Sequence, residues 1–238
     1  MNLVSRTRIL LIICLITTVG CTPKVIKMDQ ATQESLSKVH QMTAIHYESN
    51  DFEVPHHYLK YMFGVISAAI ATGVAHSEAE DVVARFHLQD PIMQVKEGFL
   101  SKFSQKFSNV KLSQISEAFT DDDINELKDG FGNQKVFDFQ TVSWGIVRAK
   151  HDFSTPPAFQ TGRNVKYSAR ARLLDVNEEK VLWQGVCDLL DEVNFGEAHL
   201  EESVPDSKEN FLKKKFETLA NRCIHELIKQ FSDTEMPT

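Results

Sequence analysis

Apolar and polar residues alternate most regularly between positions 136 and 187, and this alternation predicts three consecutive strands. The polar run 175–180 separates the second strand from the third and predicts the turn of a hairpin. The middle strand, 165–173, is typical of an antiparallel strand with one buried face and one solvated face. Its apolar positions are Val165, Tyr167, Ala169, Ala171 and Leu173, and its polar positions are Lys166, Ser168, Arg170 and Arg172.

The first of these strands, 136–148, changes its apolar phase partway along. Its apolar residues stand at odd positions near Phe137 and at even positions near Trp144. Side chains in a strand alternate with a period of two, so a one-residue change of phase predicts a β-bulge near Gln140–Thr141.

Two longer segments have the apolar spacing of amphipathic helices, 92–107 and 207–231. Together with the strands they predict an α/β (α+β) fold, with a mixed, mainly antiparallel sheet, a long C-terminal hairpin and helices packed on one face. The shorter elements predicted are strands at 43–47 and 109–112, and a helix that begins after the acidic run 121–123 and ends near Gly130.

The N-terminus has the three regions of a secretion signal, in the expected order. Arg6 and Arg8 precede the apolar run 9–16, and small residues then lead to Cys21. An N-terminal transmembrane anchor is the alternative, but the uncharged run ends at Pro23 and is shorter than the roughly 20 apolar residues that a spanning helix needs. We therefore expect residues 1–20 to be a cleaved signal peptide.

The end of this signal, Val19-Gly20-Cys21, resembles the lipobox of bacterial lipoproteins, although Thr18 stands where leucine is usual. The resemblance implies that Cys21 carries the lipid and becomes the mature N-terminus. Thr22 is not aspartate, and among sorted lipoproteins this implies the periplasmic face of the outer membrane.

Four cysteines are present, and two of them remain once the N-terminus is accounted for. Cys14 leaves with the signal and Cys21 takes the lipid, so Cys187 and Cys223 form an even pair in an oxidising compartment. Both fall on apolar faces of their predicted elements, and we expect a disulfide between them that stabilises the fold by about 4 kcal/mol. Two buried free thiols are the alternative.

The sequence divides into a signal, a tether, a domain and a tail. We expect residues 21–40 to be a polar lipidated tether, 41–231 a single domain, and 232–238 a flexible tail. Without residues 1–20 the chain keeps 24 basic and 33 acidic residues, so its formal net charge changes from −7 to −9. A net acidic surface gives no basic footprint for nucleic acid or anionic lipid.

The predicted order of elements resembles the anticodon-binding-domain-like fold of several periplasmic proteins. That family includes the N-terminal domain of the Tol translocation protein, lipoprotein activators of penicillin-binding proteins and the curli-secretion lipoprotein. The residues that carry the resemblance are Phe139–Gly145 and the hairpin segments Ala171–Val176 and Lys180–Trp183. An insertion at 58–90 departs from the compact form of the fold.

Motifs for catalysis, metals and cofactors are weak. His56 and His57 are adjacent and cannot both face one ion in a regular element, so we interpret them as exposed loop residues and expect no metal ion. No Gly-x-Ser-x-Gly elbow and no phosphate-binding glycine loop is present. The acidic run 121–123 lacks the spacing of a calcium loop. We therefore expect no enzyme activity and no cofactor.

Two features are candidates for contacts with other molecules. The uncharged segment 61–75 is too short to span a bilayer. It is either a buried helix, a helix that lies on the membrane or a segment that binds in a groove of a partner, and the buried helix is favoured. Lys166, Arg170 and Arg172 form a basic stripe on the open face of the predicted sheet. This stripe is either a partner contact or an ordinary solvated face.

The function that the sequence favours is that of a lipid-anchored periplasmic accessory protein, which acts by binding other proteins of the cell envelope. The lipid would hold the domain at the membrane and raise the effective concentration of weak contacts. The alternative is a periplasmic enzyme or ligand carrier whose cleft is formed by the 58–90 insertion.

Overall fold

The computed structural model describes residues 23–36, 38–54, 75–148, 163–193 and 205–233. Several predicted features lie outside these ranges. They are the signal peptide 1–20, the lipid attachment site Cys21, the His56–His57 pair and nearly all of the uncharged segment 61–75.

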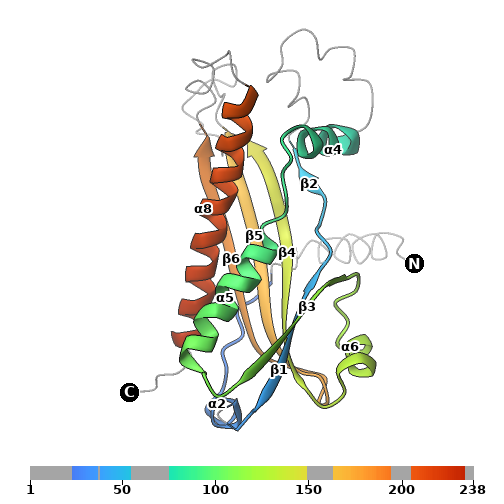
Figure 1. The fold of residues 1–238 in the computed structure, drawn as a ribbon, viewed down its shortest axis with the longest axis vertical. Coiled ribbons are helices and arrows are strands. Elements are labelled where there is room, and N and C mark those ends of the chain that lie inside the picture. Colours follow the sequence, from blue (N-terminus) through green and yellow to red (C-terminus); the bar gives the residue numbers. More distant parts are fainter. Residues whose placement is uncertain (1–22, 37, 55–74, 149–162, 194–204, 234–238) are drawn as a thin grey trace, which may run out of the picture.

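A six-stranded sheet forms the centre of the protein, with the strand order β3-β1-β4-β5-β6 and with β2 also paired to β4 (Figure 1). β1 runs parallel to both of its neighbours, whereas β4, β5 and β6 are antiparallel. The predicted mixed α/β fold and its long C-terminal hairpin are therefore confirmed. The strands are β1 (Gln41–Tyr47), β2 (Phe52–Glu53), β3 (Lys111–Phe119), β4 (Lys135–Arg148), β5 (Arg163–Asp175) and β6 (Lys180–Val193).

The predicted bulge in β4 is confirmed by a register shift between Thr141 and Ser143. Below the bulge β4 pairs with β1, and above it β4 pairs with β2. The Asn50 side chain donates to the carbonyl oxygens of Thr141 and Val142, at 2.8 and 2.9 Å, and so binds the distorted backbone. The bulge is thus the point at which β4 changes its neighbour.

The close approach of β2 to β4 requires a glycine. Gly145 pairs with Glu53, and a Cβ atom at Gly145 would lie 2.2 Å from the Glu53 carbonyl oxygen. The positive φ of 155° at this residue is also a conformation that L side chains rarely adopt.

α5 and α8 pack side by side on one face of the sheet (Figure 1). Gly98 of α5 allows them to approach closely, since a Cβ atom there would lie 2.4 Å from the Cδ1 atom of Ile224 in α8. Both amphipathic helices are confirmed, and α4 lies beside β2. The helices are α2 (Gln30–Leu36), α4 (Ala75–Arg85), α5 (Ile92–Lys106), α6 (Ile124–Phe131) and α8 (Pro205–Ser232).

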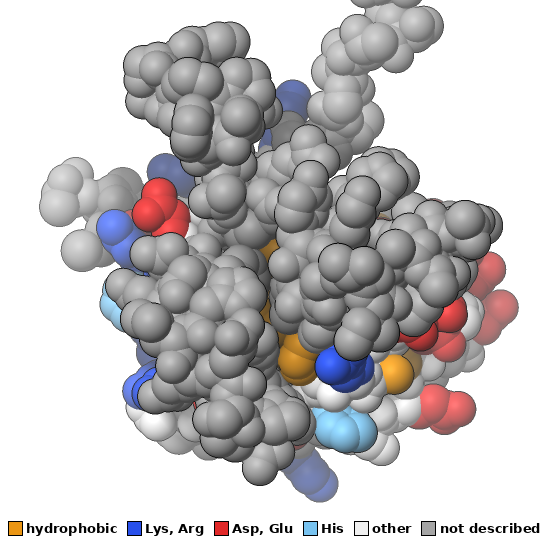
Figure 2. Space-filling model, turned by 90° about the horizontal axis from the view of Figure 1, so that it is seen from above, with side chains coloured by type: hydrophobic (Ala, Val, Ile, Leu, Met, Phe, Trp, Pro, Cys, Tyr) orange, Lys and Arg blue, Asp and Glu red, His pale blue; other side chains and the backbone are white. Residues whose placement is uncertain are grey.

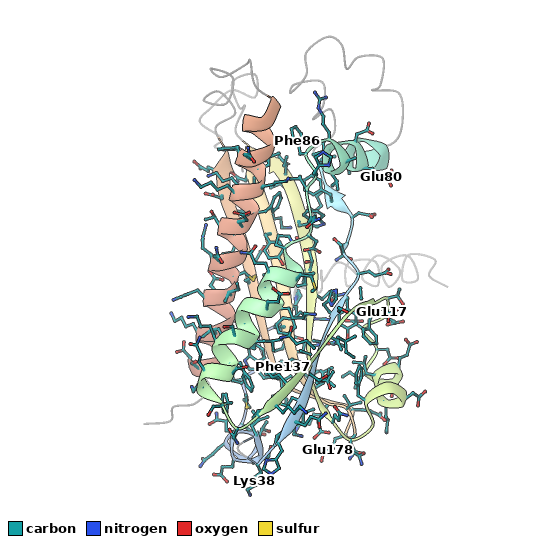
Figure 3. All side chains as sticks on the ribbon, viewed as in Figure 1. Lys38, Glu80, Phe86, Glu117, Phe137 and Glu178 are labelled. Atoms are coloured by element: carbon teal, nitrogen blue, oxygen red, sulfur yellow. A yellow bond between two sulfur atoms is a disulfide. The ribbon has the colours of Figure 1, made fainter. Side chains whose placement is uncertain are left out.

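Aromatic rings fill the space between these two helices and the sheet. Phe99 of α5 is at the centre, and Phe137 of β4 lies between α5 and the sheet (Figure 3). The Phe99 ring centroid lies 5.5–5.8 Å from those of Phe137, Phe139, Trp183 and Phe231. Such pairs add about 0.5–1.5 kcal/mol each beyond the area that they bury.

The opposite face of the sheet, called the back face below, carries a second apolar cluster under α6. Asp123 accepts a hydrogen bond from the Asn125 amide and caps this helix, as the acidic run predicted. Leu127 packs against β1, β4 and the β5–β6 hairpin. The half of the sheet below the β4 bulge, where β4 pairs with β1, is therefore covered on both faces rather than on one. It is called the lower half of the sheet below.

The structure differs from the sequence expectation in two segments. β3 continues to Phe119 instead of ending near residue 112, and its side chains are mostly exposed, so it carries no clear alternation. Part of the predicted tether packs on the domain: Ile26 forms an antiparallel bridge to Gln184, and Met28 and Leu36 are buried in the core.

The Cys187–Cys223 disulfide is confirmed and joins β6 to α8. Both cysteines are fully buried, and their Cα atoms are 5.3 Å apart. The bridge closes a loop with a sequence separation of 36 residues, which removes conformational freedom from the unfolded chain.

Replacing both cysteines with alanine is expected to lower the free energy of unfolding by about 4 kcal/mol, because the unfolded chain is no longer cross-linked. Urea denaturation of the variant and of the oxidised parent protein would measure the difference. An unchanged denaturation midpoint would contradict a bridge that constrains the unfolded state.

Candidate functional site

The predicted basic stripe lies on the back face, as expected, but it is not an open surface. Arg172 is only 7% exposed, and Arg170 and Lys166 are half-buried. The two arginines belong to a cluster of charged and polar side chains between the sheet and the segment that precedes α6.

Asp138 of β4 is the centre of this cluster. Arg172 of β5 donates to both of its carboxylate oxygens through Nε, at 3.1 and 2.9 Å, and again through Nη2. Tyr47 of β1 donates its hydroxyl hydrogen to Asp138 at 2.9 Å. Burial and the charge of Asp138 raise the pKa of Tyr47, so its hydroxyl remains a donor.

Asp122 connects the same cluster to the segment before α6. Its carboxylate accepts from Arg170 Nη2 at 2.6 Å, and its carbonyl oxygen accepts from Arg172 at 3.1 Å. The hydrogen bond from Arg170 and the charges of both arginines lower the pKa of Asp122. The arginines therefore hold α6 on the back face, and the stripe is accounted for by internal ion pairs apart from Lys166.

We expect Asp138→Ala to lower the free energy of unfolding by about 3–5 kcal/mol, because Arg172 would stay buried without its partner. The matched control is Lys128→Met, which removes the pair with Glu179. Both side chains of that pair are about 45% exposed, and the loss should be below about 1 kcal/mol. Equal losses in the two variants, measured by chemical denaturation, would contradict the structural role of the cluster.

A buried lysine–histidine pair lies between α5 and β1. Lys96 Nζ is 3.2 Å from His46 Nδ1 and donates to the Ile115 carbonyl oxygen at 2.9 Å. Ile115 lies where β3 falls out of register with β1, so the lysine binds a carbonyl at a strand irregularity. Burial lowers the pKa of Lys96. Burial and the neighbouring Lys96 lower the pKa of His46.

This pair predicts that acid weakens the fold. Unfolded His46 binds a proton near its ordinary pKa of about 6.5, whereas folded His46 stays neutral to a lower pH. The unfolded state therefore binds more protons as the pH falls through this range, and the free energy of unfolding decreases. His46→Gln should reduce the difference in unfolding free energy between pH 7.5 and pH 5.5. The control for loss of a histidine is His225→Gln on the exposed surface of α8, and an undiminished difference in His46→Gln would contradict the prediction.

A further buried carboxyl, Asp90, lies at the β4 bulge. Its Oδ1 atom accepts from the Thr141 hydroxyl at 2.6 Å and from the Ile92 amide at 2.9 Å. Burial raises the pKa of Asp90. These bonds tie the N-terminus of α5 to the bulge, so the geometry indicates a structural contact. The sequence patterns did not predict this contact, although Asp90-Pro91 before a helical run is a recognisable helix start.

The two edges of the sheet differ in how their backbone groups are occupied. On the outer edge of β6, Gln184 pairs with Ile26 through two backbone hydrogen bonds, and the Gln230 side chain binds both the amide and the carbonyl of Val186. Lys215 reaches the Glu192 carbonyl oxygen at 3.4 Å. By contrast, no described strand pairs with the outer edge of β3.

Within the described ranges, no three His, Cys, Asp or Glu side chains gather as a metal site. The same part of the chain contains no helix with the length and apolar character to span a bilayer. Acidic and basic side chains both appear around the end of the molecule shown in Figure 2.

No family model matches the sequence, and no curated protein matches it. Structural similarity was found to lipoprotein GNA1162 from Neisseria meningitidis (15% identity, 71% of this chain and 98% of that chain, TM-score 0.25). A minor lipoprotein from Acinetobacter baumannii is also similar (9% identity, 78% of this chain and 97% of that chain, TM-score 0.24). A third similar structure is that of a putative neuraminyllactose-binding hemagglutinin homolog from Helicobacter pylori (11% identity, 83% of this chain and 86% of that chain, TM-score 0.32). Similarities this distant assign neither a family nor a function to the chain.

Proposed function

We propose that this chain is a lipid-anchored accessory protein of the bacterial cell envelope, which acts by binding another envelope protein. The observation that carries the proposal is the buried Cys187–Cys223 disulfide, which belongs to an oxidising compartment. It agrees with the secretion signal and with the lipobox ending in Cys21. Thr22 after the lipidated cysteine supports placement on the periplasmic face of the outer membrane.

A non-catalytic role is supported by how the charged side chains are used. Asp138 pairs with Arg172, which binds the segment before α6 at Asp122. Lys96 binds His46 and a strand carbonyl, and Asp90 ties α5 to the bulge. Each of these buried polar groups serves a contact between elements of the fold. The alternative of an enzyme or ligand carrier depends on the 58–90 insertion, about half of which lies outside the described residues.

The outer edge of β3 is the surface proposed to bind the partner. An edge strand presents a row of backbone donors and acceptors to which a strand of another protein can add. β3 is nine residues long, and its side chains, such as Glu117, extend from the side of the sheet away from α8 (Figure 3). Polar residues at most exposed positions favour a reversible contact over aggregation.

A photoreactive amino acid at Glu117 in the native lipidated protein should cross-link to one protein in intact cells, because the partner strand lies against β3. Mass spectrometry of the adduct identifies the partner and should also find the acylated peptide that begins at Cys21. In Cys21→Ser the adduct should fall at least severalfold, since the lipid no longer holds the domain at the membrane.

The matched control places the same photoreactive residue at Glu217, which is exposed on α8. Equal adducts at Glu117 and Glu217 would contradict binding through β3. Unacylated Cys21 in the mature protein would contradict the lipid anchor, and a small molecule that copurifies in stoichiometric amount would favour the ligand carrier instead.

A further inference from the structure

The large hydrophobic residues that are most exposed in the described part of the chain lie along one edge of the sheet. They are Val25, Ile26 and Leu190, which are 48%, 39% and 44% exposed. Leu190 lies on β6, the edge strand, and Val25 and Ile26 lie in the segment that pairs with β6. These three residues are called the apolar rim below.

Ile26 and Leu190 point to the same face of the sheet. A Cβ atom at Gly185 would lie 3.0 Å from Leu227 of α8, so the neighbouring Gln184 faces the back. Ile26 is directly opposite Gln184 and shares its face, and Leu190 has the same phase as Gln184 along β6. Six residues of strand separate Gln184 from Leu190, which places the two ends of the rim about 20 Å apart.

The rim is fixed to the domain close to the proposed lipid site. Ile26 and Gln184 exchange two backbone hydrogen bonds, at 2.9 and 3.0 Å, and the Gln184 side chain donates to the Lys24 carbonyl oxygen at 2.5 Å. Met28 is buried immediately afterwards. The segment that the sequence assigns to a long tether is thus part of the folded domain from Lys24 onward.

The chain between this attachment and the lipid is short. Cys21 is five residues before Ile26, and five residues span at most about 18 Å even when fully extended. A lipid on Cys21 therefore keeps Ile26, and the part of β6 that pairs with it at Gln184, within that distance of the bilayer surface. A tether of 20 free residues would have left the orientation of the domain open.

We infer that the β6 edge rests on the membrane and that the apolar rim enters its interface. This inference rests on the proposed lipid anchor and adds an orientation to it. Lys24 and Lys27 flank Val25 and Ile26 and are exposed, which is the pattern of an interfacial segment whose lysines reach the headgroups. The exposed acidic residues Asp188 and Glu192 on the same strand favour a zwitterionic bilayer over an anionic one.

The orientation also leaves the proposed partner surface accessible. β3 and β6 are the opposite edges of the five-strand path through the sheet. With β6 on the bilayer, the outer edge of β3 faces the periplasm. The membrane contact and the partner contact are therefore compatible in one molecule.

The test measures membrane depth in the full acylated protein. Because Cys21 is acylated and the other two mature cysteines are bridged, a single introduced cysteine is the free thiol that takes an environment-sensitive dye. Ile26→Cys and Leu190→Cys carry the dye at the rim, and Glu117→Cys on β3 and Glu217→Cys on α8 are the controls. In phosphatidylcholine vesicles with brominated acyl chains, we expect at least twofold stronger quenching at the two rim positions than at the controls.

Each outcome of this measurement bears on the inference. Acylated protein that floats with the vesicles but shows equal quenching at all four positions overturns the inference and leaves the lipid anchor standing. Protein that carries no acyl chain overturns both. Rim dyes that are shielded in native envelopes but not in lipid vesicles show a protein contact at the rim, which also overturns the inference. Thermal melts of the four variants confirm that the exposed substitutions leave the fold intact.

Discussion

Burial of both faces of the lower half of the sheet is the constraint on which the structure depends. α5 and α8 cover one face with aromatic rings, and α6 covers the other with a smaller apolar cluster. A charged residue in this region must be paired, because an isolated charge out of water is far costlier than a paired one. Arg172 therefore meets Asp138, and Lys96 binds a strand carbonyl that the register shift leaves available. These polar contacts join the sheet to α5 and to the segment before α6, while the aromatic and aliphatic side chains supply the apolar core.

This constraint explains which features the sequence patterns predicted and which they did not. Alternation in β5 correctly separated the two faces, and the phase change in β4 correctly located the bulge. Alternation reports only which side a residue faces, however, and it does not report what covers that side. Arg170 and Arg172 look like a solvated stripe in sequence because their partners, Asp122 and Asp138, come from other elements. The cluster is a product of tertiary structure, and no local pattern contains it.

The segments that the sequence misjudged share a physical cause. β3 lies at an edge and buries little, so its polar residues give no period of two. The segment 24–28 adds a single bridge to β6 and buries one methionine, which is too short a signal to distinguish from a tether. The disulfide was predictable because two independent arguments agreed: the count of cysteines left after lipidation, and the apolar phase of each. A count over the whole chain and the local pattern around each cysteine thus led to the same conclusion, so the disulfide was predicted correctly.

The two edges of the sheet offer a physical basis for dividing anchoring from binding. Along β6, three unlike groups occupy outward backbone positions: a strand residue at Gln184, a side-chain amide at Val186 and an ammonium at Glu192. Such an edge is poorly suited to accept another strand, but its exposed aliphatic side chains suit an interface that needs no backbone pairing. β3 has the reverse character, with backbone groups that no described strand pairs and with few apolar side chains. A bilayer cannot satisfy unpaired backbone groups and a partner strand can, so the chemistry of each edge favours a different contact.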